Sequence, residues 1–206
     1  MSFKSNPAYA FFISLVAVAT AVLAGCASNT RITGVWVDPA AGNRAPANNV
    51  LVIGINEDST ARRIYEDAIV AQLAARGIKS QPSYNLLPEL GPAPPPDIET
   101  TLRNAGVESV LVSRTVRVST DIRVTPGHSY GPGGGFFGMW GGGYSTAPNV
   151  YTQQKVEVES RLYDVKALAL RWSGSSTTNP TSSMQGTITE FATVLIQALA
   201  EAKVIA

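Results

Sequence analysis

Residues 50–77 read VLVIGINEDSTARRIYEDAIVAQLAARG and contain two successive patterns from which the rest of the fold can be worked out. Residues 50–55 are a continuous apolar run of strand length, which is typical of a buried strand. Apolar residues then recur at helical spacing over 61–73, with Ser59 as the expected N-cap and Gly77 as the residue that ends the helix. The stretch therefore predicts a buried strand followed by an amphipathic helix.

Alternating stretches on both sides of this unit predict further strands. Residues 32–37 are expected to form a first strand, and residues 77–81 lead into a short return strand. Along 110–124 the apolar residues occupy the even positions, which predicts one long half-exposed strand. Residues 150–165 alternate as well, and 167–172 follow after a tight turn, so that the three stretches form an antiparallel meander.

Two more helices complete the expected fold. Asp97 is placed to cap a short helix over 98–104, which Gly106 ends. Thr187 and Glu190 have the spacing of a capping box at the start of a C-terminal helix. The order of elements predicts an α+β fold, with helices packed on one mostly antiparallel sheet.

The N-terminus has the pattern of a secretory signal. Lys4 is the only charge before an apolar run over 8–24, which is shorter than the roughly 20 residues of a spanning helix. The run ends in Leu23-Ala24-Gly25-Cys26, the pattern of a bacterial lipobox. We therefore expect cleavage between Gly25 and Cys26, after which the Cys26 thiol and amine carry acyl chains that anchor the protein durably.

This cleavage divides the chain into a signal peptide over 1–25, a lipidated tether over 26–31 and a single periplasmic domain over 32–206. Position 27 is Ala rather than Asp, which by resemblance to lipoprotein sorting in Gram-negative bacteria favours the outer membrane.

The composition excludes several function classes. The 206 residues carry 16 Lys and Arg against 15 Asp and Glu, and this net charge of +1 is far from the basic surplus that binds nucleic acid. Cys26 is the only cysteine, so no intramolecular disulfide or cysteine-based zinc site can form. His128 is the only histidine, and no GxSxG motif accompanies it. We therefore expect no enzyme activity, metal or cofactor.

A glycine- and aromatic-rich insert over 125–149 separates the two long strands and contains GPGGGFFGMWGGGYS. Such a length exceeds what a hairpin needs, and its large apolar side chains favour removal from water. One interpretation is docking on an envelope protein or a bilayer surface; the alternative is a disordered or self-packed loop without a partner. The side chains expected to dock are Tyr130, Phe136, Phe137, Trp140 and Tyr144.

Two groups of charges stand out in the predicted elements. Arg62 and Glu66, like Arg63 and Asp67, are four residues apart on the first helix, which predicts exposed ion pairs on one helix face. Arg114 occupies an even position of its strand, where the neighbouring even positions are apolar. It is therefore either an inward-facing charge or a residue at the sheet edge. We take it as a candidate partner-binding residue.

From residue 30 to residue 206 the chain resembles a family of uncharacterised bacterial lipoproteins with a domain of unknown function. The resemblance rests on VLVIGINEDSTARRIYED at 50–67, ARGIKSQPSYNLLP at 75–88, GVESVLVSRTVRV at 106–118, TPG at 125–127 and RLYDVKALALRWSG at 161–174. The residues that recur together in this family correspond here to Arg62, Arg63, Glu66, Asp67, Ser83, Tyr84, Tyr163, Asp164 and Trp172. Lys166-Ala167 departs from the glycine-containing turn that such proteins often have.

These observations predict a membrane-anchored envelope lipoprotein with a non-enzymatic interaction or assembly domain. The alternative is a subunit of an oligomeric envelope channel or assembly factor, in which strands from several copies form a barrel. The charged face of 152–161 argues against that alternative, because lipid-facing positions of a barrel are apolar.

Overall fold

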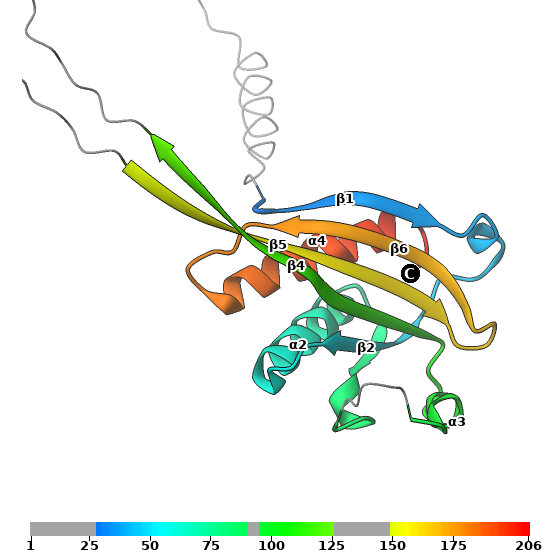
Figure 1. Ribbon diagram of the computed structural model, residues 1–206. Coiled ribbons are helices and arrows are strands. Elements are labelled where there is room, and N and C mark those ends of the chain that lie inside the picture. Colours follow the sequence, from blue (N-terminus) through cyan, green and yellow to red (C-terminus); the bar gives the residue numbers. More distant parts are fainter. Residues whose placement is uncertain (1–27, 90–94, 126–148) are drawn as a thin grey trace, which may run out of the picture.

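A six-stranded sheet carries the fold, in the order β1-β6-β5-β4-β2-β3 (Figure 1). The computed structural model describes residues 28–89, 95–125 and 149–206. The strands are β1 (Thr30–Val37), β2 (Asn49–Ile55), β3 (Lys79–Pro82), β4 (Ser109–Thr125), β5 (Asn149–Asp164) and β6 (Ala169–Thr178). β3 and β4 run parallel to β2, and the other neighbours are antiparallel, so the predicted α+β class and the β4-β5-β6 meander are confirmed.

Helices cover both faces of the sheet. α2 (Ser59–Ala75) and α4 (Met184–Glu201) pack against each other on one face (Figure 1). The short α3 (Ile98–Asn104) packs on the opposite face of β2 and β4, where its Leu102 joins Leu51 and Val110 in a separate apolar cluster. Two 3₁₀ turns, η1 (Ala41–Asn43) and η2 (Ser83–Asn85), complete the described part. No helix in that part is long and apolar enough to span a bilayer.

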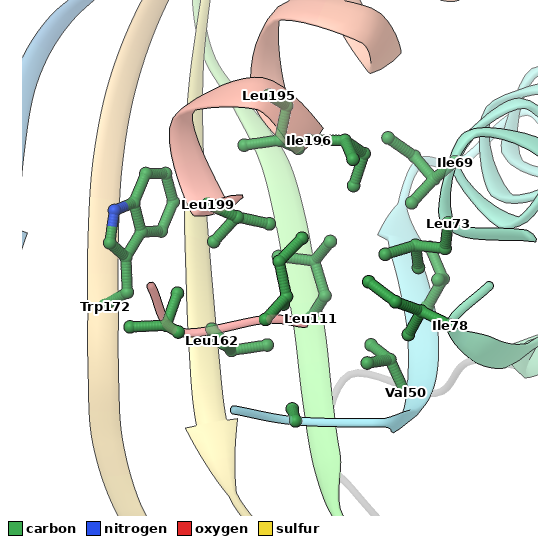
Figure 2. Packing of buried hydrophobic residues seen from close by; sticks show 14 of the residues in the cluster. Val50, Ile69, Leu73, Ile78, Leu111, Leu162, Trp172, Leu195, Ile196 and Leu199 are labelled. Atoms are coloured by element: carbon green, nitrogen blue, oxygen red, sulfur yellow. The ribbon is translucent and has the colours of Figure 1, made fainter. Parts of the chain in front are cut away.

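The main core lies between the sheet and the pair α2 and α4 (Figure 2). Strand and helix side chains interdigitate there, and those labelled in Figure 2 are Val50, Ile69, Leu73, Ile78, Leu111, Leu162, Trp172, Leu195, Ile196 and Leu199. Trp172 is fully buried and its ring lies over Gly174, where a Cβ would overlap the indole. A glycine is therefore needed two residues after the tryptophan on β6.

A β-bulge interrupts the pairing of β4 with β5. Thr115 pairs with Val158 and Arg117 pairs with Glu157, so Val116 has no partner on β5. One extra residue in a strand moves every later side chain of that strand to the other face of the sheet.

The bulge corrects the prediction for 110–124. The extent of the strand is confirmed, but its even-numbered residues do not share one face. Val110 and Val112 belong to the cluster around α3, whereas Val118 pairs with Val156 on the face that carries α2 and α4. The apolar row therefore crosses from one face to the other at Val116.

Beyond the bulge, β4 and β5 project from the sheet as a two-stranded ribbon (Figure 1). β2 pairs with β4 only as far as Arg114, and β6 pairs with β5 only from Val156 onward. We call residues 118–125 and 149–156 the arm. Both outer edges of the arm have backbone groups that no other described strand pairs.

α3 begins at Ile98 as predicted, but the N-caps of α2 and α4 lie one and four residues before the predicted ones. Asp58, not Ser59, is the N-cap of α2, and its side chain accepts hydrogen bonds from two backbone N–H groups at 2.8 and 3.2 Å. Ser183 caps α4 through Gly186 at 3.2 Å, which places the helix start before the predicted Thr187. In both helices a side-chain oxygen earlier in the chain, by one residue in α2 and by four in α4, reaches the free N–H groups of the first turn.

Glu190, predicted to act in a capping box, instead fixes the point at which the chain enters the domain. Its carboxylate accepts hydrogen bonds from Ser28 Oγ at 2.7 Å, Asn29 Nδ2 at 3.3 Å and Thr30 N at 3.0 Å. β1 consequently begins at Thr30, two residues before the predicted strand. The last residues of the predicted tether are therefore part of the folded domain.

Candidate functional site

An open apolar cavity of about 230 Å³ lies between the N-terminal ends of α2 and α4 and the base of the arm. Its apolar lining residues are Ile55, Tyr65, Val156, Val158, Met184, Ile188 and Phe191. Ile55 and Met184 are 53% and 55% exposed, although both are large apolar side chains. The cavity is thus a hollow in the surface that is still in contact with water.

The apolar lining continues onto one face of the arm. Val156 lines the cavity and pairs with Val118, and side chains of directly paired residues lie on the same face of a sheet. Ile122 and Val124 follow Val118 at even spacing, and these three side chains are 57–66% exposed. We call the cavity together with Val118, Ile122 and Val124 the apolar groove. On this face Thr120 and its partner Gln154 separate Val118 from Ile122, so the exposed apolar side chains of the arm alternate with polar ones. Large exposed apolar side chains beside an apolar cavity favour an interaction site.

The opposite face is charged at the base of the arm. Arg117 lies 4.0 Å from Glu157, which also lies 3.7 Å from Lys155. Asp121 follows on the same parity of β4 as Arg117 and is exposed. The two faces therefore differ: one carries exposed aliphatic side chains and the other carries charges at the base of the arm and the exposed Tyr151 further out.

Polar groups at the inner end of the cavity are satisfied among themselves. The Tyr65 hydroxyl donates to Ser113 Oγ at 2.6 Å, and Ser113 Oγ lies 2.7 Å from Ser160 Oγ. Burial raises the pKa of Tyr65 well above its ordinary value, so the phenol stays protonated at any ordinary pH. This arrangement supplies neither a base nor an activated nucleophile.

Arg114 lies at the mouth of the apolar groove and is not an inward-facing charge, contrary to one of the two interpretations above. It is exposed and pairs with Glu159 at 2.9 Å. Glu159 also accepts from Arg161 at 2.6 Å, and hydrogen bonds from Arg161 and then Arg114 lower the pKa of this carboxyl. Arg114 precedes the bulge and shares a face with Val110 and Val112, but the apolar cluster around α3 includes no residue of β4 beyond Val112, so its parity in the sequence does not predict burial.

The predicted exposed pair of Arg62 and Glu66 is in fact buried. The two side chains form an ion pair at 2.9 Å and are 7% and 0% exposed. Glu66 also accepts hydrogen bonds from Gly54 N at 3.0 Å, Ser83 Oγ at 2.6 Å and Tyr84 N at 3.2 Å. The pair joins α2 to β2 and to the turn η2, which covers it.

The second predicted pair does not form. Asp67 accepts a hydrogen bond from the Tyr84 hydroxyl at 2.6 Å, and the Arg63 guanidinium lies 4.6 Å from the centre of the Tyr84 ring. The hydrogen bond to Asp67 raises the pKa of Tyr84. The residues behind the family resemblance near 62–67 and 83–84 therefore form one structural network.

Several predicted site residues lie outside the described residues. They are Gly25 and Cys26 at the lipobox, His128, and the insert residues Tyr130, Phe136, Phe137, Trp140 and Tyr144. The insert connects the two strands of the arm, so it follows directly on the apolar groove along the chain. Among the described residues, no three His, Cys, Asp or Glu side chains gather as metal ligands do.

No protein-family model matches the chain, and no curated protein matches it. Several solved structures are similar at low identity, among them the following two. A PelC dodecamer from Paraburkholderia phytofirmans is 16% identical, with a TM-score of 0.48, over 86% of this chain and 99% of that one. The lipoprotein GNA1162 from Neisseria meningitidis is 17% identical, with a TM-score of 0.43, over 76% of this chain and 99% of that one. Similarity at this level establishes neither a family nor an activity.

Proposed function

We propose that the chain is a lipid-anchored protein of the bacterial outer membrane, facing the periplasm, and that it acts by binding an envelope protein rather than by catalysis. The lipobox ending at Cys26 supports the anchor. The observation that carries the binding role is the apolar groove, in which Ile122 on the arm has the highest exposed fraction among the large apolar side chains, 66%.

The entry point of the chain supports an anchor close to the arm. Thr30 pairs with Thr178, and Thr178 pairs with Val156 at the base of the arm. Two strand spacings, about 10 Å, therefore separate the start of β1 from β5. Glu190 accepts a hydrogen bond from Ser28, and only two residues of chain connect Ser28 to Cys26. Fully extended, these two residues span at most about 7 Å, so a lipid on Cys26 lies close to the domain. Anchoring at Cys26 thus brings the arm and the apolar groove to the bilayer surface.

The partner that fits this surface is an extended apolar segment of an envelope protein. The edge of β4 beyond Arg114 has no neighbouring strand among the described elements, so a segment can pair with its backbone. Alternate apolar side chains of such a segment would lie in the apolar groove, next to Ile55 and Met184. The main-chain bonds would supply affinity and the groove would supply specificity.

A photo-cross-linking amino acid on the two faces of the arm tests this role in living cells. Position Ile122 is in the apolar groove, and position Ser119 lies on the same strand with the opposite parity. We expect Ile122 to capture one defined envelope protein and Ser119 to capture little of it. With the cross-linker at position Val118, Ile122→Asp should abolish capture of that protein. Loss of capture on deletion of residues 131–143 would show that the insert takes part in binding. Equal capture of unrelated proteins from both faces would contradict the proposal.

Lipidation has its own test. We expect an inhibitor of lipoprotein signal peptidase to leave the precursor uncleaved, and Cys26→Ala to release the protein from the membrane fraction. Normal processing in the presence of the inhibitor would rule out the anchor at Cys26 without bearing on the apolar groove.

The second candidate function is an oligomeric envelope assembly, which the two open edges of the arm favour. An edge of β4 in one copy can pair with an edge of β5 in the next. The charged face formed by Arg117, Lys155 and Glu157 argues against arms surrounded by lipid. Size measurement of the detergent-extracted protein decides between the two, since a monomer excludes the assembly.

The absence of catalysis stays a prediction. A hydrolase screen of the full-length protein beside His128→Ala tests it directly, because that is the only histidine of the chain. Activity that disappears with His128 would overturn the non-enzymatic role.

A further inference from the structure

A second cleft, of about 850 Å³, lies at the end of the sheet opposite the arm. It is formed by the first residue of β4, the last of β5, the start of β6 and the loop over 44–47, which Figure 1 shows far from the arm. Basic side chains outnumber acidic ones in its lining: Arg44, Arg103, Lys166 and Arg171 against Glu108 and Asp164. The cleft is therefore electropositive.

Arg171 is buried in this cleft without a carboxylate partner. The residue is 2% exposed, and none of the ion pairs among the described residues includes it. Nη2 donates to the carbonyl of Ala45 at 3.0 Å, whereas Nε is buried and has no hydrogen-bond partner. A fully buried arginine is normally paired, because an uncompensated charge away from water is costly. Arg171 is therefore a buried cation that no described carboxylate neutralises by direct contact.

Two other unsatisfied groups line the same cleft. Arg44 pairs with Asp38 through Nη2 at 3.2 Å, but its Nη1 is buried without a partner. Ser109 is fully buried and its Oγ has no partner either. Of the five buried side-chain atoms without a partner among the described residues, three thus line this one cleft. Buried polar groups are usually satisfied, so this concentration of free hydrogen-bonding capacity favours a polar binding site.

The strand pairing explains how Arg171 comes to line the cleft. Leu162 pairs with Trp172 and Tyr163 pairs with Leu170, so Arg171 is an extra residue in β6 without a partner on β5. Bulges of this kind redirect a side chain and recur next to functional sites. The bulge places Arg171 next to the loop that contains Arg44 and Ala45.

The two acidic side chains of the cleft are engaged elsewhere. Asp164 Oδ1 accepts a hydrogen bond from Ala167 N at 2.7 Å, within the turn between β5 and β6. Glu108 Oε2 accepts from Asn48 N at 3.0 Å. Each carboxylate thus fixes a loop and neither neutralises Arg171.

We propose that this cleft binds a small molecule that carries a carboxylate or phosphate group, and that Arg171 and Arg44 are the residues that bind this group. The planar guanidinium matches both oxyanions, which it binds through two parallel N–H donors. The volume of the cleft falls within the range of small-molecule sites. This site is independent of the apolar groove and of the anchor at Cys26.

Thermal unfolding of the full-length protein in detergent, at constant ionic strength, tests the site. The probes are inorganic phosphate for the phosphate class and glucuronate for the carboxylate class, with sodium chloride as the reference. We expect a saturable rise in Tm with at least one probe, and the probe that acts identifies the class. No rise with either probe overturns the proposal.

Arg171→Met separates binding from folding. Met keeps much of the side-chain length without the charge, so we expect Tm without a probe to stay equal or rise, while the probe-dependent rise disappears. Arg44→Gln, a partly exposed position, should fold in any case and weaken binding roughly tenfold or more. Arg117→Gln removes the same charge about 25 Å along β4 and should leave binding unchanged. An equal rise in Tm in wild type, Arg171→Met and Arg44→Gln shows an adventitious ion only.

Discussion

At the scale of single residues, Glu66 illustrates how a surface motif becomes a buried network. Spacing of four residues from Arg62 predicts the pair, but nothing in residues 59–75 indicates that the turn η2 covers it. Ser83 and Tyr84 reach Glu66 from 17 and 18 residues further along the chain. Burial therefore depends on tertiary contacts that helical periodicity does not contain.

Removal of Glu66 should destabilise the protein strongly. Glu66→Ala leaves Arg62 buried without its partner, which costs about 3–5 kcal/mol. The double variant Arg62→Met with Glu66→Leu removes both charges and should cost less than the single one. Urea denaturation measures both. A single variant that is as stable as the double variant would contradict the role of the buried ion pair.

Leu168 is a second residue whose conformation has a measurable cost. It lies in the turn between β5 and β6 with φ of 51°, in the left-handed region, and its side chain is 59% exposed. Leu168→Gly removes a strain of about 1 kcal/mol, so we expect Tm to rise by roughly 2–4 °C. The neighbouring Ala167→Gly, where φ is not positive, should lower Tm or leave it unchanged. A fall in Tm for Leu168→Gly would show that the side chain packs usefully in the turn.

At the scale of elements, the contact between α4 and the start of β1 depends on one carboxylate. The Ser28 hydroxyl, and then Asn29 and the Thr30 backbone, lower the pKa of Glu190 from its ordinary value of 4.5. A carboxyl whose pKa is lowered in the folded state contributes its full stabilisation at pH values above the ordinary pKa. This contribution is lost as pH falls through the lowered pKa.

Glu190→Gln should therefore destabilise the protein by about 1 kcal/mol near neutral pH. The difference in free energy of unfolding between wild type and variant should shrink as pH falls below 4.5. Chemical denaturation across this pH range measures the difference. The matched control is Glu201→Gln, whose side chain bonds to Gln197 within the same helix. A difference that is independent of pH would refute the contribution of the ionised carboxylate.

The elements themselves were largely predictable, because each has a clear periodicity or a continuous apolar run. The bulge at Val116 was not, since an apolar residue there continues the even-numbered pattern and only the partner strand reveals that it is unpaired. The same reason applies to Arg171, which is an extra residue only when β5 is compared with β6. Pairing irregularities of this kind arise between strands and leave no trace in either strand alone.

At the scale of the whole molecule, the two candidate sites lie at opposite ends of one long sheet. β4 has 17 residues, so about 55 Å separates its two ends. The apolar groove lies near the end at which the chain enters the domain, and the cleft around Arg171 lies at the other end. Neither site was predictable in full, because each is assembled from segments far apart in the sequence. Of the partner-binding residues predicted from the sequence, Arg114 is the only one within the described residues, and it lines the apolar groove.

This arrangement predicts how the anchored protein stands on a bilayer. An environment-sensitive fluorophore on Ile122→Cys should emit at shorter wavelength when the full-length protein is bound to lipid vesicles, because the arm approaches the bilayer. The same fluorophore on Lys166→Cys, next to the distant cleft, should emit as it does in water. Cys26 does not interfere, because its thiol is consumed in the proposed lipid linkage. Identical spectra at both positions would contradict this orientation.

The hydrogen bonds from residues 28–30 to Glu190 also affect how tightly the arm must bind its partner. With so little free chain between a lipid on Cys26 and the domain, the arm is confined to a thin layer next to the membrane, where its effective concentration is in the millimolar range for a short linker. Contacts too weak to be detected between dissolved molecules are then sufficient. A version of the protein without its anchor would therefore underestimate every affinity of the arm, and binding is best measured on a lipid surface.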